Sequence, residues 1–553
     1  MKRELKNIFI VIGLTIISTI ILLTTENLYA NVDNFNISLV TNGLFGTDDV
    51  YTYYLHPWLC LFIKTIAQNV STVDGYVFLM HCLIIVSFWG IYDIIIRKNI
   101  DIIYKIGFVL ITIISAMSVC IWNCNYTIQA ALFTFIGITF IFNSESRIYR
   151  YIIGIIILCF GFMWRMNGAL LVVPFVILNI VFRVIDKKQY YMNVKNIIKY
   201  FMIPMVCIVV LIGVQYKYEN SAQYKEHIEY SKSRTEVEDF PTYRWEAVED
   251  KISSVTESQY NAVLAWRLFD TELINTNIFK EISKVAATNM YPYSFKGVIG
   301  AIKEMAYKYL INFHSWIWTL SGIIFIFLLF LGKNIKNNRM ACIEVGLSIL
   351  GAFLIIFYFT IRGRAIIQIW TSVVLIVEFL TATLTIRKLE GINDKKYKKI
   401  FGVGIILIGL AGSCLNHANI QWHIPQFAIN SRSINRKDKF CETYKDDSIY
   451  IWGCWHKDVS LVHMAQGKLP SREFMNHNLP IGDWMYGQKY FNDYLEKLDI
   501  KNPAKSLIKR EHTYLVDIDC TFVLDYLRKN YGKTISVKQI DTIHGVPVWK
   551  FDE

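Results

Sequence analysis

The stretch Asn7-Ile-Phe-Ile-Val-Ile-Gly-Leu-Thr-Ile-Ile-Ser-Thr-Ile-Ile-Leu-Leu-Thr-Thr25 decides the fold class, because it contains no charged side chain. A helix of this length crosses the hydrocarbon core of a bilayer, which is about 30 Å thick. Lipid offers backbone amides no hydrogen-bond partner, so a run of this kind must be helical. The basic residues Lys2, Arg3 and Lys6 precede the run, and they predict a cytoplasmic N-terminus and an uncleaved first span.

Similar runs recur along the chain, which has 553 residues, of which 54% are hydrophobic and only 18% charged. This composition excludes an ordinary soluble protein. The net charge of +12 is explained by Lys and Arg in cytoplasmic loops, so no nucleic-acid partner is expected. We predict a polytopic α-helical membrane protein of about 11 transmembrane helices, and after the first the spans are expected at about 75–96, 106–122, 127–143, 151–164, 167–182, 200–215, 313–332, 340–360, 365–386 and 400–415.

The distribution of basic residues supports this topology. When the spans alternate from a cytoplasmic N-terminus, every loop rich in Lys and Arg falls on the same side, including the cluster at 387–399. The long segments at about 26–74, 216–312 and 416–553 then lie outside the cytoplasm. We therefore predict a transmembrane domain over residues 1–415 and a small extracytoplasmic α/β domain over residues 416–553, in a multi-pass protein of the cell membrane.

Local patterns predict structure within the three outer segments. Residues 55–67 are apolar but too short to span, so we expect an interfacial helix that begins at His56-Pro57, with proline in its first turn. The second segment is expected to be mostly helical, with a break at Pro241. In the third segment, β-rich runs predict strands at 448–452, 513–518 and 546–551, with a helix at 522–531.

Cysteines give little information about function. Most lie in or beside apolar runs, where a thiol behaves as a small apolar group. Cys441, Cys454 and Cys520 fall in the third outer segment, where one pair has the compartment to oxidise. No spacing typical of a metal site occurs.

Asp33 is the first candidate for chemistry, because it follows the first span at the membrane surface, beside apolar and aromatic residues. A carboxylate in such surroundings has a raised pKa and suits a general base. The alternative is a cap for a loop or helix. Asp48, Asp49 and His56 are further candidates for a functional site. The alternative for Asp48-Asp49 is a simple turn, and the alternative for His56 is that it only begins the interfacial helix.

Three arginines break the charge rule, because Arg165, Arg362 and Arg364 close hairpins on the predicted outer side. A guanidinium at membrane depth suits bidentate binding of a phosphate, so these residues are candidates for holding a phosphorylated lipid. The alternative is snorkelling to ordinary headgroups. Arg234 in the second outer segment is a candidate for substrate contact, with an ion pair to Asp239 as the alternative.

The layout resembles the membrane-embedded C-class glycosyltransferases (the GT-C superfamily), and uncharacterised bacterial members most of all. Shared features are a first span followed at once by an acidic outer loop, an interfacial helix that opens at His-Pro, many later spans and a C-terminal α/β domain. The residues that carry the resemblance are Asp33-Asn34, Gly43-Leu-Phe-Gly46, His56-Pro57, Arg165-Met-Asn167-Gly168 and Gly363-Arg364.

The resemblance implies an inverting glycosyltransferase that moves a sugar from a polyprenyl-phosphate donor to an extracytoplasmic glycan, lipid or protein acceptor. By resemblance, Asp33 is the catalytic carboxylate, and Arg165 and Arg364 neutralise the leaving phosphate. Asp48-Asp49 is a candidate second acidic motif, and the further candidates for substrate binding are His56, Asn167, Arg234 and Arg362. No cofactor is required, and a divalent metal is used by only part of the class. The single Asp33 followed by Asn34 departs from the paired acidic motif of better-known members.

Two other functions remain open on sequence. A transporter or lipid flippase commonly has internal repeats and ionisable residues at mid-membrane, whereas here Glu344 and Glu378 are the nearest cases. A non-enzymatic surface or assembly protein would use the C-terminal domain as its working part.

Overall fold

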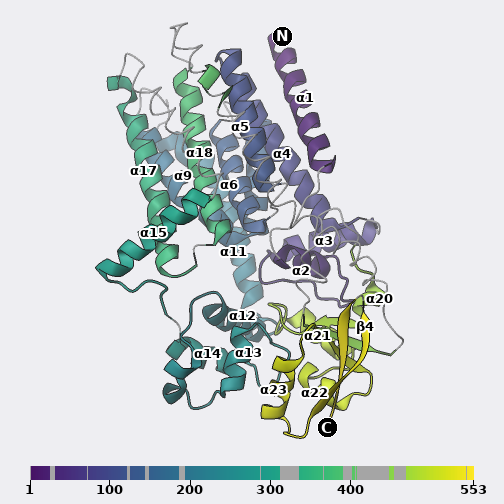
Figure 1. The fold of residues 1–553 in the computed structure, drawn as a ribbon. Helices are drawn as coiled ribbons and strands as arrows, with labels where there is room; N and C mark the ends of the chain where they lie inside the picture. Colours follow the sequence, from purple (N-terminus) through teal and green to yellow (C-terminus); the bar gives the residue numbers. More distant parts are fainter. Residues whose placement is uncertain are drawn as a thin grey trace.

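The structure is a computed structural model that describes residues 2–24, 32–70, 73–120, 125–143, 148–185, 194–286, 288–311, 335–364, 366–389, 402–404, 406–407, 447–453, 469–543 and 545–553. A bundle of long helices forms one half of the molecule, and short helices and a sheet form the other (Figure 1). The N-terminus lies at the far end of the bundle, and the C-terminus lies in the other half, which we call the globular body.

The bundle consists of apolar helices, five of which are long and apolar enough to cross a membrane within the described ranges. The predicted spans that fall within these ranges coincide with helices of the bundle. The span at 313–332 lies outside the described residues, as does most of that at 400–415, so the count of about 11 stays a prediction. The helices are α1 (Lys2–Thr24), α4 (Gly75–Arg97), α5 (Ile102–Cys120), α6 (Tyr126–Phe142), α7 (Ile148–Trp164), α8 (Met166–Leu170), α9 (Val173–Ile185), α11 (Val194–Glu219), α17 (Ile335–Ile361) and α18 (Ile367–Leu389).

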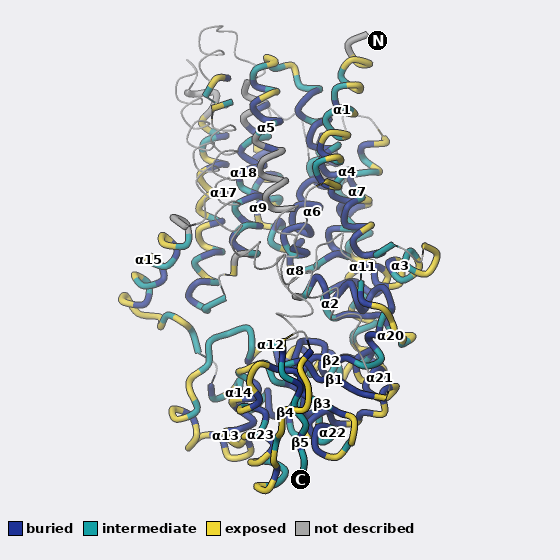
Figure 2. Tube along the Cα trace, turned by 45° about the vertical axis from the view of Figure 1, so that its right-hand side comes forward, coloured by how far each residue is buried: buried dark blue, intermediate teal, exposed yellow. Residues whose placement is uncertain are grey.

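The pattern of buried and exposed side chains in the bundle is the one expected of a protein surrounded by lipid. Helix α6 is buried on nearly every side and forms the centre of the bundle (Figure 2). By contrast, α11 leaves large apolar side chains uncovered, with Met202 60% and Val209 61% exposed. Continuous apolar surface of this kind is unfavourable in water but matches hydrocarbon. The bundle is therefore that of a membrane protein.

The first predicted outer segment forms two helices at the junction between the bundle and the globular body (Figure 1). Helix α3 (Pro57–Asn69) confirms the helix expected at 55–67, with His56 as its N-cap and Pro57 in its first turn. One side of α3 is buried through Leu59 and Ile63, while Trp58 on the other side is half exposed. Helix α2 (Val32–Thr41) was not predicted.

The second predicted outer segment is helical with a break, as expected. It contains α12 (Lys225–Glu238), the short 3-10 helices η1 (Trp245–Ala247) and η2 (Glu249–Lys251), α13 (Glu257–Leu264), α14 (Thr276–Ala286) and α15 (Phe295–Ile311). Helix α12 ends directly before Pro241, which confirms the predicted break.

The C-terminal segment forms a five-stranded mixed sheet of order β2-β1-β3-β5-β4. Strand β1 pairs in parallel with β2 and β3, and β5 pairs antiparallel with β3 and β4. The predicted strands and helix are confirmed as β1, β3, β5 and α23, whereas the very short β2 and the largely exposed β4 were not predicted. The elements are β1 (Ile449–Trp452), α20 (Arg472–Met475), β2 (Asn478–Pro480), α21 (Lys489–Lys497), α22 (Pro503–Lys509), β3 (Thr513–Val516), α23 (Thr521–Asn530), β4 (Ser536–Ile543) and β5 (Val546–Asp552).

A buried carboxylate joins the second and third segments into the one globular body. Asp270 is fully buried, and it accepts hydrogen bonds from Asn502 Nδ2 (2.9 Å), Tyr526 OH (2.9 Å) and Tyr531 OH (2.7 Å). Hydrogen bonds to a charged group are stronger than neutral ones, and this set rigidifies the body. The predicted domain boundary near residue 415 lies outside the described residues, so that division stays a prediction.

Candidate active site

Helix α2 brings Asp33 to the end of the bundle that faces the globular body. Asp33 lies in the first turn of α2 and accepts a hydrogen bond from the hydroxyl of Tyr126, at the start of α6, at 3.1 Å. Burial raises the pKa of Asp33 to about 6, the nearby Asp483 carboxylate raises it further, and the charge of Arg165 opposes the shift. Asp33 is therefore a stronger base than an ordinary aspartate and is still largely ionised at neutral pH.

The second carboxylate, Asp483, comes from the far end of the chain. Asn36, one turn after Asp33 on α2, donates a hydrogen bond to Asp483 at 2.7 Å. A side chain at the preceding Gly482 would place its Cβ 1.6 Å from the carbonyl oxygen of Trp266, so only glycine allows this close backbone contact. Burial raises the pKa of Asp483 to about 7.

The third carboxylate is paired with a buried arginine on α12. Arg234 is 2% exposed, and its guanidinium lies 3.2 Å from Glu238 Oε2. Burial raises the pKa of Glu238 to about 8 although Arg234 opposes the shift. An ion pair of Arg234 was expected with Asp239, and this prediction is wrong because the partner is Glu238. The i,i+4 spacing places Glu238 on the same helix face as Arg234, whereas Asp239 is the C-cap of α12.

Asp239 pairs instead with Arg364, in the hairpin between α17 and α18. The guanidinium groups of Arg362 and Arg364 both lie over the ring of Phe240, at 4.8 and 5.2 Å from its centroid. Gly363 between them has a φ of 78°, and a Cβ there would lie 2.4 Å from Pro241 Cγ. The hairpin thus docks against the break that follows α12.

Arg165 lies at the N-cap of α8, and two tyrosine rings flank its guanidinium. The ring centroids of Tyr54 and Tyr126 lie 4.5 and 5.1 Å away. Within the described residues the guanidinium makes no hydrogen bond or ion pair, and its Nε is buried. Arg234 Nε is also buried without a hydrogen-bond partner there. Each arginine thus keeps a buried donor for an acceptor such as an anion.

The surroundings of Tyr53 indicate that these charges form one cluster. Burial raises the pKa of Tyr53, while the charges of Arg165, Arg234 and Arg364 all oppose that shift. The structure therefore gathers Asp33, Arg165, Arg234 and Arg364, together with Asp239, Glu238 and Asp483. We call this set the charge cluster.

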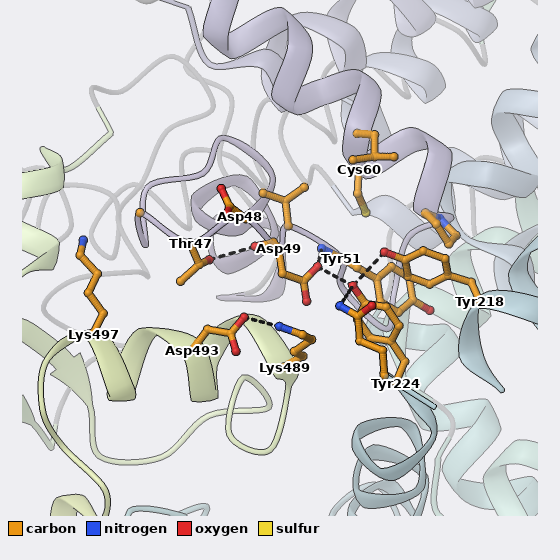
Figure 3. Close-up of a pocket in the computed structure, with 15 residues that line it drawn as sticks. Thr47, Asp48, Asp49, Tyr51, Cys60, Tyr218, Tyr224, Lys489, Asp493 and Lys497 are labelled. Atoms are coloured by element: carbon orange, nitrogen blue, oxygen red, sulfur yellow. Dashed lines mark hydrogen bonds and ion pairs between the residues drawn. The ribbon is translucent and has the colours of Figure 1, made fainter. Parts of the chain in front are cut away.

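Other predicted site residues lie outside the charge cluster. Both ring nitrogens of His56 are engaged with backbone, because Nδ1 accepts from the N–H of Trp58 and Nε2 lies 3.0 Å from the carbonyl oxygen of Leu211. Burial lowers the pKa of His56, which favours the neutral ring that these contacts require. Asn167 is exposed on α8. Asp48 and Asp49 line a separate cavity of about 570 Å³ that is lined neither by Asp33 nor by the arginines (Figure 3).

Sequence reasoning missed Asp483, Glu238, Tyr54 and Tyr126. Asp483 stands alone in the apolar stretch Leu479-Pro-Ile-Gly-Asp-Trp484, and an isolated acid in such a stretch is a usable signal. The spacing of Glu238 from Arg234 was a second signal. The contacts of the two tyrosines arise only from tertiary structure.

The described residues test the metal and disulfide predictions only in part. Among the described residues, no group of three His, Cys, Asp or Glu side chains is arranged to hold a metal ion. Independence from a metal stays a prediction. Cys520 is a buried free thiol, whereas Cys441 and Cys454 lie outside the described residues.

Comparison with known proteins gives one match. No protein-family model matches the chain, and no curated protein matches it. Among solved structures, the chain is similar to ArnT from Cupriavidus metallidurans, in a crystal structure bound to undecaprenyl phosphate. The match covers 98% of this chain and 97% of the other, with 10% sequence identity and a TM-score of 0.38. Similarity at this level assigns no activity to the chain.

Proposed function

We propose that this protein is an inverting glycosyltransferase that moves a sugar from a polyprenyl-phosphate donor to an acceptor outside the cytoplasm. The observation that carries the proposal is the charge cluster at one end of an apolar bundle. Asp33, with a pKa of about 6, accepts a hydrogen bond from Tyr126, whose ring lies 5.1 Å from the Arg165 guanidinium, and Tyr53 lies near Arg165, Arg234 and Arg364. A base and an anion-binding set at membrane depth are the two components that transfer from a lipid phosphate requires.

Asp33 is the base in this proposal. The hydroxyl oxygen of the acceptor attacks the anomeric carbon of the donor, and the bond from that carbon to the phosphate oxygen breaks on the opposite face. Asp33 accepts the proton of the attacking hydroxyl as the new glycosidic bond forms. Tyr126, which donates to Asp33 Oδ2 at 3.1 Å, fixes the orientation of the carboxylate.

The arginines stabilise the leaving polyprenyl phosphate. Negative charge grows on the phosphate in the transition state, and donors already in place stabilise it without reorganisation. The buried Nε groups of Arg165 and Arg234 would gain acceptors from phosphate oxygens. Arg364 supplies a third positive charge, with Asp239 as its resting partner.

Product analysis tests the proposal. The purified chain is incubated with a panel of polyprenyl-phosphate hexoses and candidate glycan, lipid and peptide acceptors, and products are identified by mass spectrometry. We expect release of polyprenyl phosphate that depends on both donor and acceptor, with inversion at the anomeric carbon. A protein that translocates these lipids across vesicles but never cleaves them would contradict the proposal.

The rate of transfer should depend on the ionisation of Asp33. The protonated carboxyl cannot accept a second proton, so activity should be lost as pH falls through the pKa of about 6. Below that pH, kcat/KM should fall by roughly tenfold per unit, and above it a plateau is expected. A pH profile of kcat/KM for the acceptor, measured at saturating donor, checks this, and a rate that rises on acidification through pH 6 would contradict it.

Reversing the charge at Arg364 should weaken donor binding. Arg364→Glu removes a phosphate ligand and places a second negative charge beside Asp239. Because a hydrogen bond to a charged group contributes about 1.5–3 kcal/mol, the donor KM should rise by about 10- to 100-fold. Arg472→Glu, at an exposed position of the globular body, is the control. If Arg364→Glu leaves the donor KM unchanged, Arg364 does not bind the phosphate.

A further inference from the structure

A polar cavity of about 570 Å³ lies outside the charge cluster (Figure 3). Its volume falls within the range of small-molecule sites, about 300–1,000 Å³. The loop after α2, the start of α3, the end of α11 and helix α21 all contribute to it. Its polar and aromatic lining comprises Thr47, Asp48, Asp49, Tyr51, Tyr218, Gln223, Tyr224, Lys489, Asp493 and Lys497.

Asp49 presents an unsatisfied acceptor in this cavity. Its Oδ1 accepts hydrogen bonds from Tyr224 OH at 3.0 Å and from the N–H of Tyr51 at 3.1 Å. Its Oδ2 is buried and has no hydrogen-bond partner among the residues that the structure describes. Buried polar atoms are nearly always paired, so this oxygen is suited to a donor from a ligand.

Three tyrosines form a wall beside Asp49. The ring of Tyr51 lies edge-on to those of Tyr218 and Tyr224, with centroids 4.9 and 5.4 Å away. Tyr218 OH donates to Tyr224 OH at 2.9 Å, and Tyr224 OH donates onward to Asp49. The relay holds Asp49 in place. The rings of Tyr218 and Tyr224 stack with centroids 4.4 Å apart, and the partly exposed Tyr218 offers ring surface next to hydrogen-bonding groups, a combination that suits the C–H face and hydroxyls of a sugar.

Helix α21 supplies the opposite wall and balances the charge. Lys489 pairs with Asp493 at 2.5 Å, and Lys497 donates to Asn476 Oδ1 at 3.0 Å. Together with Asp48 and Asp49, the lining carries three carboxylates against these two lysines. The cavity therefore has one more carboxylate than lysines, which disfavours a phosphate or an acidic sugar, while the two lysines remain as donors for the hydroxyls of a neutral polar ligand.

We propose that this cavity binds a neutral sugar unit of the acceptor, an inference that rests on the proposed glycosyltransferase function. Sugar hydroxyls both donate and accept, so one ring can donate to Asp49 Oδ2 and accept from a lysine of α21. The helix also connects the two sites, because Tyr490 on α21 lies near both Asp49 and Asp483. An acceptor anchored in the cavity would thus extend its reacting hydroxyl toward Asp33.

Direct binding measurements test the inference without any transfer assay. The full chain in detergent micelles is titrated with methyl pyranosides of glucose, galactose and mannose, followed by saturation-transfer NMR. Glucuronic acid serves as the charged comparator. We expect saturable binding of at least one neutral pyranoside and weaker binding of glucuronic acid. Absence of saturable binding by all the neutral pyranosides, or a preference for glucuronic acid, would overturn the inference.

Substitutions locate the binding. Asp49→Asn removes the charged acceptor and should weaken binding of the neutral pyranoside by about 10- to 100-fold. Tyr224→Phe keeps the ring but frees Asp49 Oδ1, so it should weaken binding in the same direction by a smaller factor. Asp525→Asn, at an exposed position of α23, is the matched control. Unchanged affinity in both Asp49→Asn and Tyr224→Phe would overturn the inference.

Kinetics separate this inference from the proposed function. Asp49→Asn should raise the acceptor KM and leave the donor KM unchanged, while Asp33→Asn should lower the rate of transfer by about 10²- to 10⁴-fold and leave pyranoside binding unchanged. If pyranosides bind through Asp49 but no donor is cleaved, the proposed function fails and the sugar site stands. If transfer occurs with an unchanged acceptor KM in Asp49→Asn, the sugar site fails and the function stands.

Discussion

Replacing Asp33 by asparagine is expected to lower the rate of sugar transfer by about 10²- to 10⁴-fold, the usual contribution of a general base. Asparagine has nearly the same shape, and its carbonyl oxygen can still accept the hydrogen bond from Tyr126. It cannot accept the proton of the attacking hydroxyl. The measurement is the initial rate in proteoliposomes supplied with a polyprenyl-phosphate sugar and its acceptor.

The interpretation of Asp33→Asn depends on two controls. Asp519→Asn changes a carboxylate that lies outside the charge cluster, in the loop before α23, and should leave the rate unchanged. Donor binding by Asp33→Asn should also be preserved, because the proposal assigns the phosphate to the arginines. Full transfer activity in Asp33→Asn would remove Asp33 from the role of base.

The second large effect is expected on stability, from Arg234→Leu. Arg234 and Glu238 form an ion pair that is almost entirely inaccessible to solvent. Burial raises the pKa of Glu238 to about 8, so the measurement is made above that pH, where removing Arg234 leaves a buried carboxylate without its counter-charge, at a typical cost of about 3–5 kcal/mol. We therefore expect a clear fall in the thermal unfolding temperature of the detergent-solubilised protein. A variant as stable as the natural protein would show that the pair is not buried in solution.

The double variant Arg234→Leu/Glu238→Leu separates structure from binding. Replacing both members by apolar residues avoids the unpaired charge and should recover most of the lost stability. It should not recover donor binding, because the guanidinium is still missing. Recovery of both stability and the donor KM would mean that Arg234 serves only to hold α12 in place.

Much of the fold was predictable because helices that cross a membrane require long apolar runs in the sequence. Apolar runs identified the bundle helices, and the His56-Pro57 pair identified the start of α3. Helix α2 was missed because it is buried on every side, so that buried polar residues alternate with the buried apolar Phe35, Ile37 and Leu39 and no apolar stripe of helical period appears. Asn36 and Ser38 are buried through hydrogen bonds to Asp483 and Asp74, and neither partner is adjacent in sequence. The hydrophobicity of neighbouring residues in the sequence therefore does not predict this helix.

The candidate site was only partly predictable, for a related reason. Arg165 and Arg364 stood out because they break the distribution of basic residues in membrane proteins, and the structure places both in the charge cluster. Their surroundings could not be predicted, because Asp483 lies 447 residues from Asn36, to which it is hydrogen-bonded. The candidate role of His56 came from a dipeptide pattern, whereas its ring holds α3 against α11.

Asp48-Asp49 shows how adjacency in sequence can mislead about a shared site. The pair belongs to the same short segment as Asp33, yet it lines the cavity against α21 rather than the charge cluster. The turn after α2, with Gly43 and Gly46 at positive φ, redirects the chain between the two places. The two acidic positions therefore have different proposed partners, the reacting hydroxyl for Asp33 and a distal sugar for Asp49.

In the proposed mechanism the charge cluster holds the phosphate of a polyprenyl donor, and photo-crosslinking tests this most directly. The purified chain would be irradiated with a polyprenyl phosphate that carries a diazirine on its first isoprene unit, and labelled peptides would be identified by mass spectrometry. We predict labels on peptides that contain Tyr53 and Tyr54, Arg165 or Arg364, displaced by excess unlabelled polyprenyl phosphate. Displaceable labelling confined to other parts of the chain would contradict the account.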